Sequence, residues 1–300
     1  MASPIVSTIT GYVEEHRTEL ISKAVLIGRT ANYLNLMTGV VGPTTLNLYD
    51  TTVVLQDGST CGFTDSGSTT LSQRVLTPAI LKSNMTYCPK NLLKTYAQHL
   101  VKVGAGKETL PFEEKFVSSI ADGVSEAIEN MIWQGQSGQT NQFEGFLSIL
   151  SAATNSVKVN EASGTTAAQA IEDTYMAIPA QIVEKEDTVI FVGEEIFREY
   201  IQSLVKANMY HYDATYGEGV YKVPGSNIRV IAVNGLNNTH KIVAGQLKNM
   251  FYGVDMENDS ETFDVWYSKD DDVWKVNVSF SSGVQVAYPQ EVVLTTIATA

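Results

Sequence analysis

The stretch TLPFEEKFVSSIADGVSEAIENMIWQG, residues 109–135, has the strongest helical pattern in the chain. Thr109 can cap its first turn, Pro111 suits that turn because its missing N–H would have no partner there, and Glu113 lies near the positive end of the helix dipole. Gly135 is expected to end the helix. About 24 residues at 1.5 Å each give roughly 36 Å, so we expect the rest of the protein to be arranged along this helix. Its apolar face recurs at spacings of three and four and consists of Phe112, Phe116, Ile120, Val124, Ala127, Ile128 and Met131.

The segment before this helix, residues 42–87, is rich in Thr, Ser, Gly and β-forming residues. Asp57-Gly58 lies between Val53-Val54-Leu55 and Cys61-Gly62-Phe63, which predicts a β-hairpin because both turn residues tolerate positive φ. Arms of about ten residues would reach roughly 33 Å at 3.3 Å per residue. A two-stranded ribbon of that length is marginal unless it lies on something else. Either a neighbouring subunit or the protein's own core could supply that support.

The first forty residues include ELISKAVLIGRTANYLNL, residues 19–36, whose apolar residues recur at helical spacing. The acidic and basic residues of this region cancel, so it does not have the character of a basic nucleic-acid-binding tail. It is either an N-terminal arm or a helix packed on its own domain.

Residues from about 160 to 260 alternate between helical and strand patterns, which indicates an α/β unit. DTVIFVG, residues 187–193, is expected to be a buried strand, and Pro179 is expected to kink the helix that precedes it. The last thirty residues return to β structure. In VWKVNVSF, residues 273–280, apolar and polar residues alternate, and Ser281-Ser282-Gly283 is expected to turn the chain into a hairpin with VQVAYP.

Composition argues against several functional classes. The net charge of −13 works against broad contact with nucleic-acid phosphates, and no apolar run approaches the roughly 18 residues that cross a bilayer. The N-terminus lacks a basic segment followed by an apolar run. The two cysteines, Cys61 and Cys88, and the four histidines have no metal-ligand spacing, which fits a reducing cytoplasm without a disulfide framework. We expect no catalytic, cofactor or metal site.

Short motifs point the same way. GAGKET, residues 104–109, lacks the first glycine and the Ser or Thr of a phosphate-binding loop. GSTCG has Thr60 where a hydrolase has its serine, and Asp270-Asp271-Asp272 reads as a solvated turn. One loop does suggest a role in binding other proteins, since rigid aromatic rings are favoured at interfaces. It contains Tyr210, His211, Tyr212 and Tyr216; partial burial within the subunit is the alternative reading.

The order of these parts resembles that of tailed-bacteriophage major capsid proteins, the Hong Kong 97-like capsid fold. The resemblance spans nearly the whole chain. The sequence stretches that carry it are TYCPKNLLKTYAQHL, IWQGQSGQTNQFEGFLSIL, TVIFVGEEIFREYIQSLVKANMYHY, GQLKNMFYGVDMEND and VNVSFSSGVQVAYPQEVV.

This resemblance implies an α+β fold with an N-terminal arm (1–41), an extended β-hairpin loop (42–87), a peripheral domain with a long spine helix (88–160 and 262–300) and an α/β axial domain (161–261). It implies pentamers and hexamers that form an icosahedral shell around double-stranded DNA, without sequence-specific DNA binding. The protein would be located in the virion and assembled in the host bacterial cytoplasm. Its partners would be further copies of itself, with a separate scaffolding protein or none, and portal and decoration proteins. The expected inter-subunit contacts include Asp57, Gly58, Phe63 and Arg74 from the loop, and the tyrosine-rich loop of the axial domain.

One departure from the family concerns crosslinking. Some members link subunits through a lysine on the extended loop, whereas residues 42–81 contain no lysine and Arg74 is their only basic residue. We therefore expect a shell held by noncovalent contacts. Two alternatives remain open: an encapsulin-type compartment shell built on the same fold, and an α/β enzyme of unknown chemistry.

Overall fold

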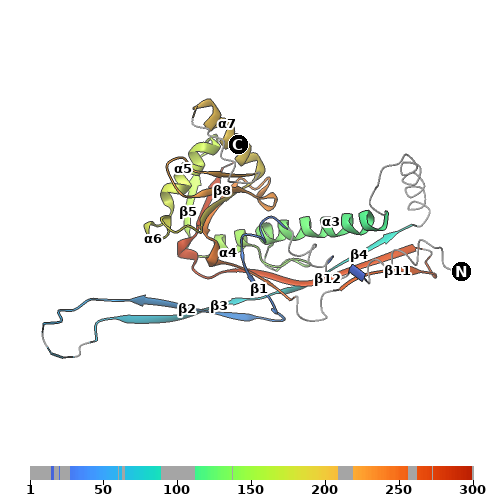
Figure 1. Ribbon diagram of the computed structural model, residues 1–300, viewed down its shortest axis with the longest axis horizontal. Helices are drawn as coiled ribbons and strands as arrows, with labels where there is room; N and C mark the ends of the chain where they lie inside the picture. Colours follow the sequence, from blue (N-terminus) through green and yellow to red (C-terminus); the bar gives the residue numbers. More distant parts are fainter. Residues whose placement is uncertain are drawn as a thin grey trace.

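The computed structural model describes residues 15–16, 20, 28–59, 61–62, 65–88, 112–136, 138–208, 219–255, 262–271 and 273–298. Within these ranges the molecule is elongated (Figure 1). A long β-sheet carries a long helix along one face, and a compact α/β unit sits near one end of that sheet. A two-stranded ribbon projects beyond the same end. This combination of separate sheets and helices confirms the predicted α+β class.

The helices and strands have the following bounds. The α-helices are α3 (Phe112–Gln134), α4 (Phe146–Ala152), α5 (Ala167–Ala177), α6 (Ala180–Val183) and α7 (Glu194–Lys206), and the 3-10 helices are η1 (Asn234–Leu236), η2 (Leu247–Asn249) and η3 (Pro289–Glu291). The strands are β1 (Asn35–Met37), β2 (Thr44–Thr52), β3 (Ser68–Leu76), β4 (Ala79–Tyr87), β5 (Val157–Glu161), β6 (Thr188–Val192), β7 (Val220–Lys222), β8 (Arg229–Ala232), β9 (Lys241–Gln246), β10 (Met250–Val254), β11 (Thr262–Ser268), β12 (Val273–Val286) and β13 (Val293–Ile297).

The long helix predicted from residues 109–135 is α3, and it packs on the long sheet. Of the predicted apolar face, Ile120, Val124 and Ile128 are buried, Ala127 is exposed and Met131 is half-buried. The buried face is centred one residue further along, because Ala121, Ile132 and Trp133 also enter the core. Each fully buried aliphatic side chain contributes roughly 1.5–3 kcal/mol, so this stripe is enough to fix α3 on the sheet.

The long sheet has the strand order β1-β10-β12-β11, with β4 paired to the other side of β12. β12 is its central strand and pairs with β11 over its first half, with β10 over its last residues and with β4 from Trp274 to Ser282. The predicted hairpin at Ser281-Ser282-Gly283 was wrong, because the chain continues as one extended strand through these residues. Both serines are buried, and Gly283 allows the close approach of the segment at Thr77 and Pro78. The close neighbours on both sides keep this segment extended.

The α/β unit is built on a six-stranded sheet with the order β5-β13-β9-β6-β8-β7. All five residues of β6 are buried, as predicted for a strand covered on both faces. Ile190 and Val192 belong to one hydrophobic cluster with α5 and α7, whereas Val189 and Phe191 belong to the cluster that includes α3. The sheet therefore joins the two halves of the core.

Two strands pair outside the segments to which the sequence assigned them. β10 was expected in the axial segment 161–261 but pairs with β12 in the long sheet. β13 was expected in the peripheral segment 262–300 but pairs with β9 and β5 in the six-stranded sheet. The expected kink at Pro179 separates α5 from α6, and Ile178 before it is extended, as residues preceding proline usually are.

Candidate functional site

The ribbon of β2 and β3 is anchored to its own subunit by one face only. Leu46 and Leu48 are buried beside Ala287 and Tyr288, and Leu76 packs against Gly253. The Tyr288 hydroxyl accepts a hydrogen bond from the Tyr49 N–H at 3.2 Å and donates one to the Tyr49 carbonyl at 3.2 Å. These contacts hold the ribbon up to Tyr49.

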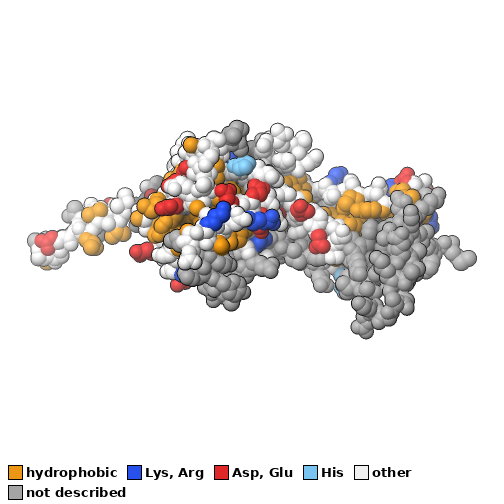
Figure 2. Space-filling model, turned by 90° about the horizontal axis from the view of Figure 1, so that it is seen from above, with side chains coloured by type: hydrophobic (Ala, Val, Ile, Leu, Met, Phe, Trp, Pro, Cys, Tyr) orange, Lys and Arg blue, Asp and Glu red, His pale blue; other side chains and the backbone are white. Residues whose placement is uncertain are grey.

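The other face of the ribbon carries uncovered apolar side chains. Tyr49 and Leu71 face each other across the two strands and are 64% and 69% exposed. Beyond the paired strands, the connection of residues 53–67 carries Val53, Val54 and Leu55, of which Leu55 is 93% exposed. Figure 2 shows hydrophobic side chains along the projecting ribbon and acidic ones at its end. Contiguous exposed apolar side chains of this kind mark interaction surfaces.

A groove between α3 and β4 is a second candidate contact surface. It encloses about 460 Å³, and Lys82 is an exposed residue of its wall. Lys82 pairs with no carboxylate in the described part of the chain. No pattern in the sequence indicated this groove, although the exposed Gly123 and Ala127 of α3 leave space for it. Its apolar lining includes Leu81, Met85, Ile120, Val124, Met131 and Phe280.

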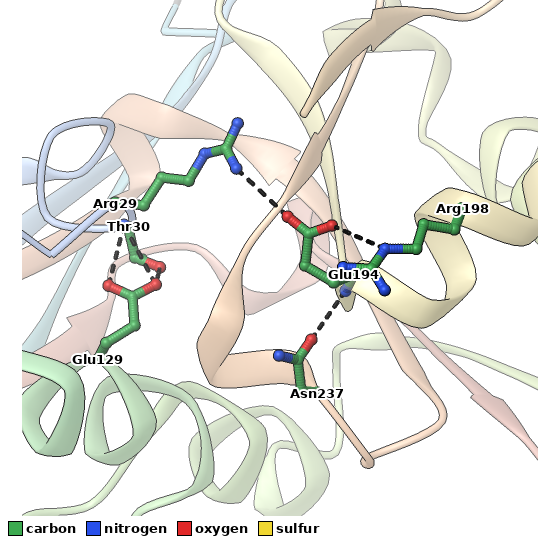
Figure 3. A network of polar contacts seen from close by, with 6 residues as sticks. All are labelled: Arg29, Thr30, Glu129, Glu194, Arg198 and Asn237. Atoms are coloured by element: carbon green, nitrogen blue, oxygen red, sulfur yellow. Dashed lines mark hydrogen bonds and ion pairs between the residues drawn. The ribbon is translucent and has the colours of Figure 1, made fainter. Parts of the chain in front are cut away.

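A buried polar cluster joins three segments of the chain (Figure 3). The Glu129 carboxylate, on α3, accepts hydrogen bonds from the N–H of Thr30, at 3.1 Å to its Oε2, and from the Thr30 hydroxyl. The backbone of Gly235, in η1, lies against α3 at Glu129, and its N–H lowers the pKa of this carboxyl. The Trp133 indole donates to the Thr30 hydroxyl at 2.8 Å. Burial raises the pKa of the Glu129 carboxyl, and the hydrogen bonds and the positive charge of Arg29 oppose that rise.

Ion pairs extend this cluster to α7. Arg29 lies 3.5 Å from the Glu194 carboxylate, and Arg198 lies 3.8 Å from the other oxygen of that group. The Asn237 side chain accepts a hydrogen bond from the Glu194 N–H at 2.8 Å, which caps the start of α7. The segment that contains Arg29 is thus tied to both α3 and the α/β unit.

The same architecture occurs in solved capsid structures. A chain of the capsid of a native GTA particle matches with a TM-score of 0.61 at 12% identity, covering 93% of this chain and 91% of that one. A chain of the satellite phage P4 procapsid including size determination (Sid) protein matches with a TM-score of 0.63 at 11% identity, covering 100% and 93%. This is the fold of tailed-phage major capsid proteins.

The capsid fold extends to a virus-like particle from Pyrococcus furiosus, which matches with a TM-score of 0.53 at 10% identity and covers 98% of this chain and 100% of that one. No protein-family model and no curated protein sequence matches the chain. At these identities the likeness establishes the fold, so the function is argued from the chain's own surfaces.

The residues predicted to contact neighbouring copies lie in several parts of the structure. Asp57 and Gly58 are exposed in the connection of the ribbon, which is longer than the tight turn expected at that point. Asp57 accepts hydrogen bonds from the Ser59 hydroxyl and N–H, which lower the pKa of its carboxyl and stabilise the local turn. Arg74 lies near the base of the ribbon, half-buried, where burial lowers its pKa and the charge of Glu144 opposes this. Phe63 and the loop with Tyr210, His211, Tyr212 and Tyr216 lie outside the described residues.

Among the described residues, no group of three or more His, Cys, Asp or Glu side chains could hold a metal ion. Asp270 and Asp271 are exposed in a turn, while Asp272 and the GAGKET stretch lie outside the described residues. Cys61 and Cys88 are exposed free thiols. In the part of the chain that the structure covers, no helix is long and apolar enough to span a membrane.

Proposed function

We propose that this chain is a major capsid protein whose copies assemble into a closed shell, a structural and not an enzymatic role. The observation that carries the proposal is a capsid fold with a ribbon anchored on one face only. Its other face and its connection expose apolar side chains that the described part of its own chain does not cover. A second copy would supply that cover.

In this proposal the copies form pentamers and hexamers of an icosahedral shell around double-stranded DNA, assembled in the host cytoplasm and located in the virion. The division into an N-terminal arm, extended loop, peripheral domain and axial domain is part of the proposal, with β10 and β13 assigned according to the sheets in which they pair. Scaffolding, portal and decoration proteins would be separate chains. The net charge of −13 supports a container whose wall does not bind its DNA tightly.

The apolar groove between α3 and β4 suits the ribbon of an adjacent copy. Its lining could take the Leu55 side chain, and burial of one leucine stabilises a contact by roughly 1.5–3 kcal/mol. Asp57 lies two residues beyond Leu55, and Lys82 at the groove carries the opposite charge. Because residues 42–81 contain no lysine, we propose noncovalent contacts between copies, with Asp57 and Gly58 among them.

Expression of the full chain, alone and with candidate scaffolding proteins, tests the proposal. Electron microscopy and size-exclusion chromatography should show closed shells or capsomers of defined size. Monodisperse monomers under all these conditions would contradict it. Tight binding of duplex DNA to empty shells at physiological salt would contradict the proposal that the shell wall does not bind its DNA tightly.

A compartment shell of the encapsulin type is the second candidate, and the fold shared with the Pyrococcus furiosus virus-like particle is compatible with it. The two candidates differ in what fills the shell. Mass spectrometry of particles purified from the native source would find a stoichiometric enzyme cargo in a compartment. In a phage head it would find portal proteins, and nuclease-protected DNA would be extracted from the same particles.

A further inference from the structure

The groove between α3 and β4 is apolar over most of its lining. Its volume of about 460 Å³ lies in the range of small-molecule sites, roughly 300–1,000 Å³. Met85 and Met131 line it as half-buried side chains, and methionine adapts to ligands of different shape because it is unbranched and polarisable. The groove is therefore a preformed slot for an apolar chain. Its buried lining residues are Leu81, Ile120, Val124 and Phe280.

Lys82 is the one charged residue among those that line the groove. It is exposed, and in the described part of the chain it forms no ion pair with a carboxylate. Ser83, Ser119 and Asn141 add uncharged groups that can donate hydrogen bonds. A cation and hydrogen-bond donors beside an apolar slot complement an acyl chain that ends in a carboxylate.

The charges on the two walls of the groove differ in sign. Asp122 and Glu126 are exposed on α3, next to Gly123 and Ala127 of the lining. These acidic residues repel a carboxylate near α3, whereas Lys82 attracts one to β4. A ligand of this class would therefore place its carboxylate at the β4 side of the groove.

We propose that the groove between α3 and β4 is a binding site for soluble medium-chain carboxylates, with the carboxylate at Lys82 and the acyl chain against the apolar lining. The ribbon of a neighbouring copy presents the same chemistry, since Leu55 is an exposed apolar side chain and Asp57 supplies a carboxylate two residues later. A bound carboxylate would take the place of the ribbon and inhibit assembly. This second consequence rests on the proposed contact between ribbon and groove, whereas the binding itself does not.

Methyl NMR of the full chain, with isotope-labelled methionine and below the concentration at which it assembles, tests the binding. The probes are hexanoate, octanoate and decanoate, each below its micelle concentration. We expect the methyl signals of Met85 and Met131 to shift, while that of Met176, which is 75% exposed on α5, stays in place. Each added methylene that the groove buries should lower the Kd about fourfold.

One variant and one neutral ligand separate the carboxylate from the chain. Lys82→Gln should raise the Kd of octanoate about two- to fivefold, as expected for a partly exposed ion pair. It should leave the Kd of octanol unchanged, because the alcohol carries no charge. Lys248→Gln, at an 85% exposed lysine of η2, is the matched control and should leave both values unchanged.

Two results would overturn the site. One is an absence of shifts at Met85 and Met131, or shifts of the same size at Met176, which would indicate binding over the whole surface. The other is a Lys82→Gln variant that binds octanoate as well as the unsubstituted protein does, or that weakens octanol equally.

Light scattering of assembling protein with decanoate present then tests the competition. A lower yield of shells than without decanoate supports it. An unchanged yield under conditions where the signals of Met85 and Met131 shift would overturn the contact between ribbon and groove, and the carboxylate site would stand without it.

Discussion

The Tyr288 hydroxyl bonds to both backbone groups of Tyr49, accepting from its N–H and donating to its carbonyl. These two residues are 239 positions apart in sequence. The pair marks the point where the ribbon leaves its own subunit: buried leucines hold the chain before it, and exposed residues follow it. The short link between β12 and η3, near the C-terminal end of the described chain, thus helps to hold the ribbon at this point.

Tyr288→Phe should loosen the ribbon without unfolding the protein. It removes two hydrogen bonds of a partly exposed hydroxyl, which should lower the free energy of unfolding by about 0.5–1.5 kcal/mol. Hydrogen exchange should increase at residues 47–51, and the yield of shells should fall. Tyr175→Phe, in α5, is the control, because its hydroxyl makes no hydrogen bond among the described residues. Equal effects of the two substitutions would show that the Tyr288 hydroxyl does not anchor the ribbon.

Leu55→Asp should block assembly while the subunit stays folded. The side chain is 93% exposed, so its replacement should change the free energy of unfolding by less than about 0.5 kcal/mol. Loss of its burial in a contact between copies should reduce shell formation, measured by light scattering and electron microscopy. Met176→Asp, at a 75% exposed apolar position of α5, is the matched control. If both variants fail to assemble equally, the connection of the ribbon has no special part in assembly.

A charge exchange tests the pairing of the ribbon with the groove. Lys82→Asp and Asp57→Lys should each reduce assembly, because each places like charges at the proposed contact. The double variant should recover part of the loss, and the coupling of a partly exposed pair should be about 0.2–1 kcal/mol per contact. Critical assembly concentrations of the four proteins measure this coupling. Losses that simply add in the double variant would mean that the two residues do not meet.

Gly283→Ala should destabilise the long sheet. A Cβ at this position would lie 2.9 Å from the Thr77 carbonyl oxygen and 3.0 Å from the Pro78 Cα, both backbone atoms that cannot move aside easily. We expect a loss of about 1–3 kcal/mol in the free energy of unfolding, measured by urea denaturation. Gly42→Ala, where a Cβ meets nothing within 4 Å, should leave stability within about 0.5 kcal/mol. A neutral Gly283→Ala would show that the backbone at Thr77 and Pro78 can shift.

The raised pKa of Glu129 should make the free energy of unfolding depend on pH. Its pKa is higher in the folded state than in the unfolded chain, so its contribution to stability is fully present below the unfolded pKa and is lost as the pH rises through the folded pKa. Glu129→Gln should remove this contribution. The difference in free energy of unfolding between the unsubstituted protein and the variant, measured by urea denaturation at a series of pH values, should therefore fall as the pH rises over that window. A difference that stays constant or grows with pH would contradict the raised pKa.

Local patterns predicted the elements whose neighbours are close in sequence or whose periodicity is strong. The apolar spacing around Ile120, Val124 and Ile128 predicted α3, and the apolar run of residues 189–192 predicted a strand buried on both faces. The hairpin signal at Asp57-Gly58 predicted the ribbon but not its paired length, because the turn residues fix only their own φ and ψ. No local pattern distinguished the anchored face of the ribbon from its exposed face, since both carry leucines.

The sequence by itself thus determined the class of the fold, the long helix and the presence of a β-ribbon, because these depend on local propensity and periodicity. Tertiary structure alone decided that Ser281-Ser282-Gly283 stays extended, that β10 joins the long sheet and β13 the six-stranded sheet, and that Glu129 meets Thr30 and Gly235. Each of these depends on segments brought together from distant parts of the chain. There, close packing and the need to satisfy buried polar groups outweigh local preference.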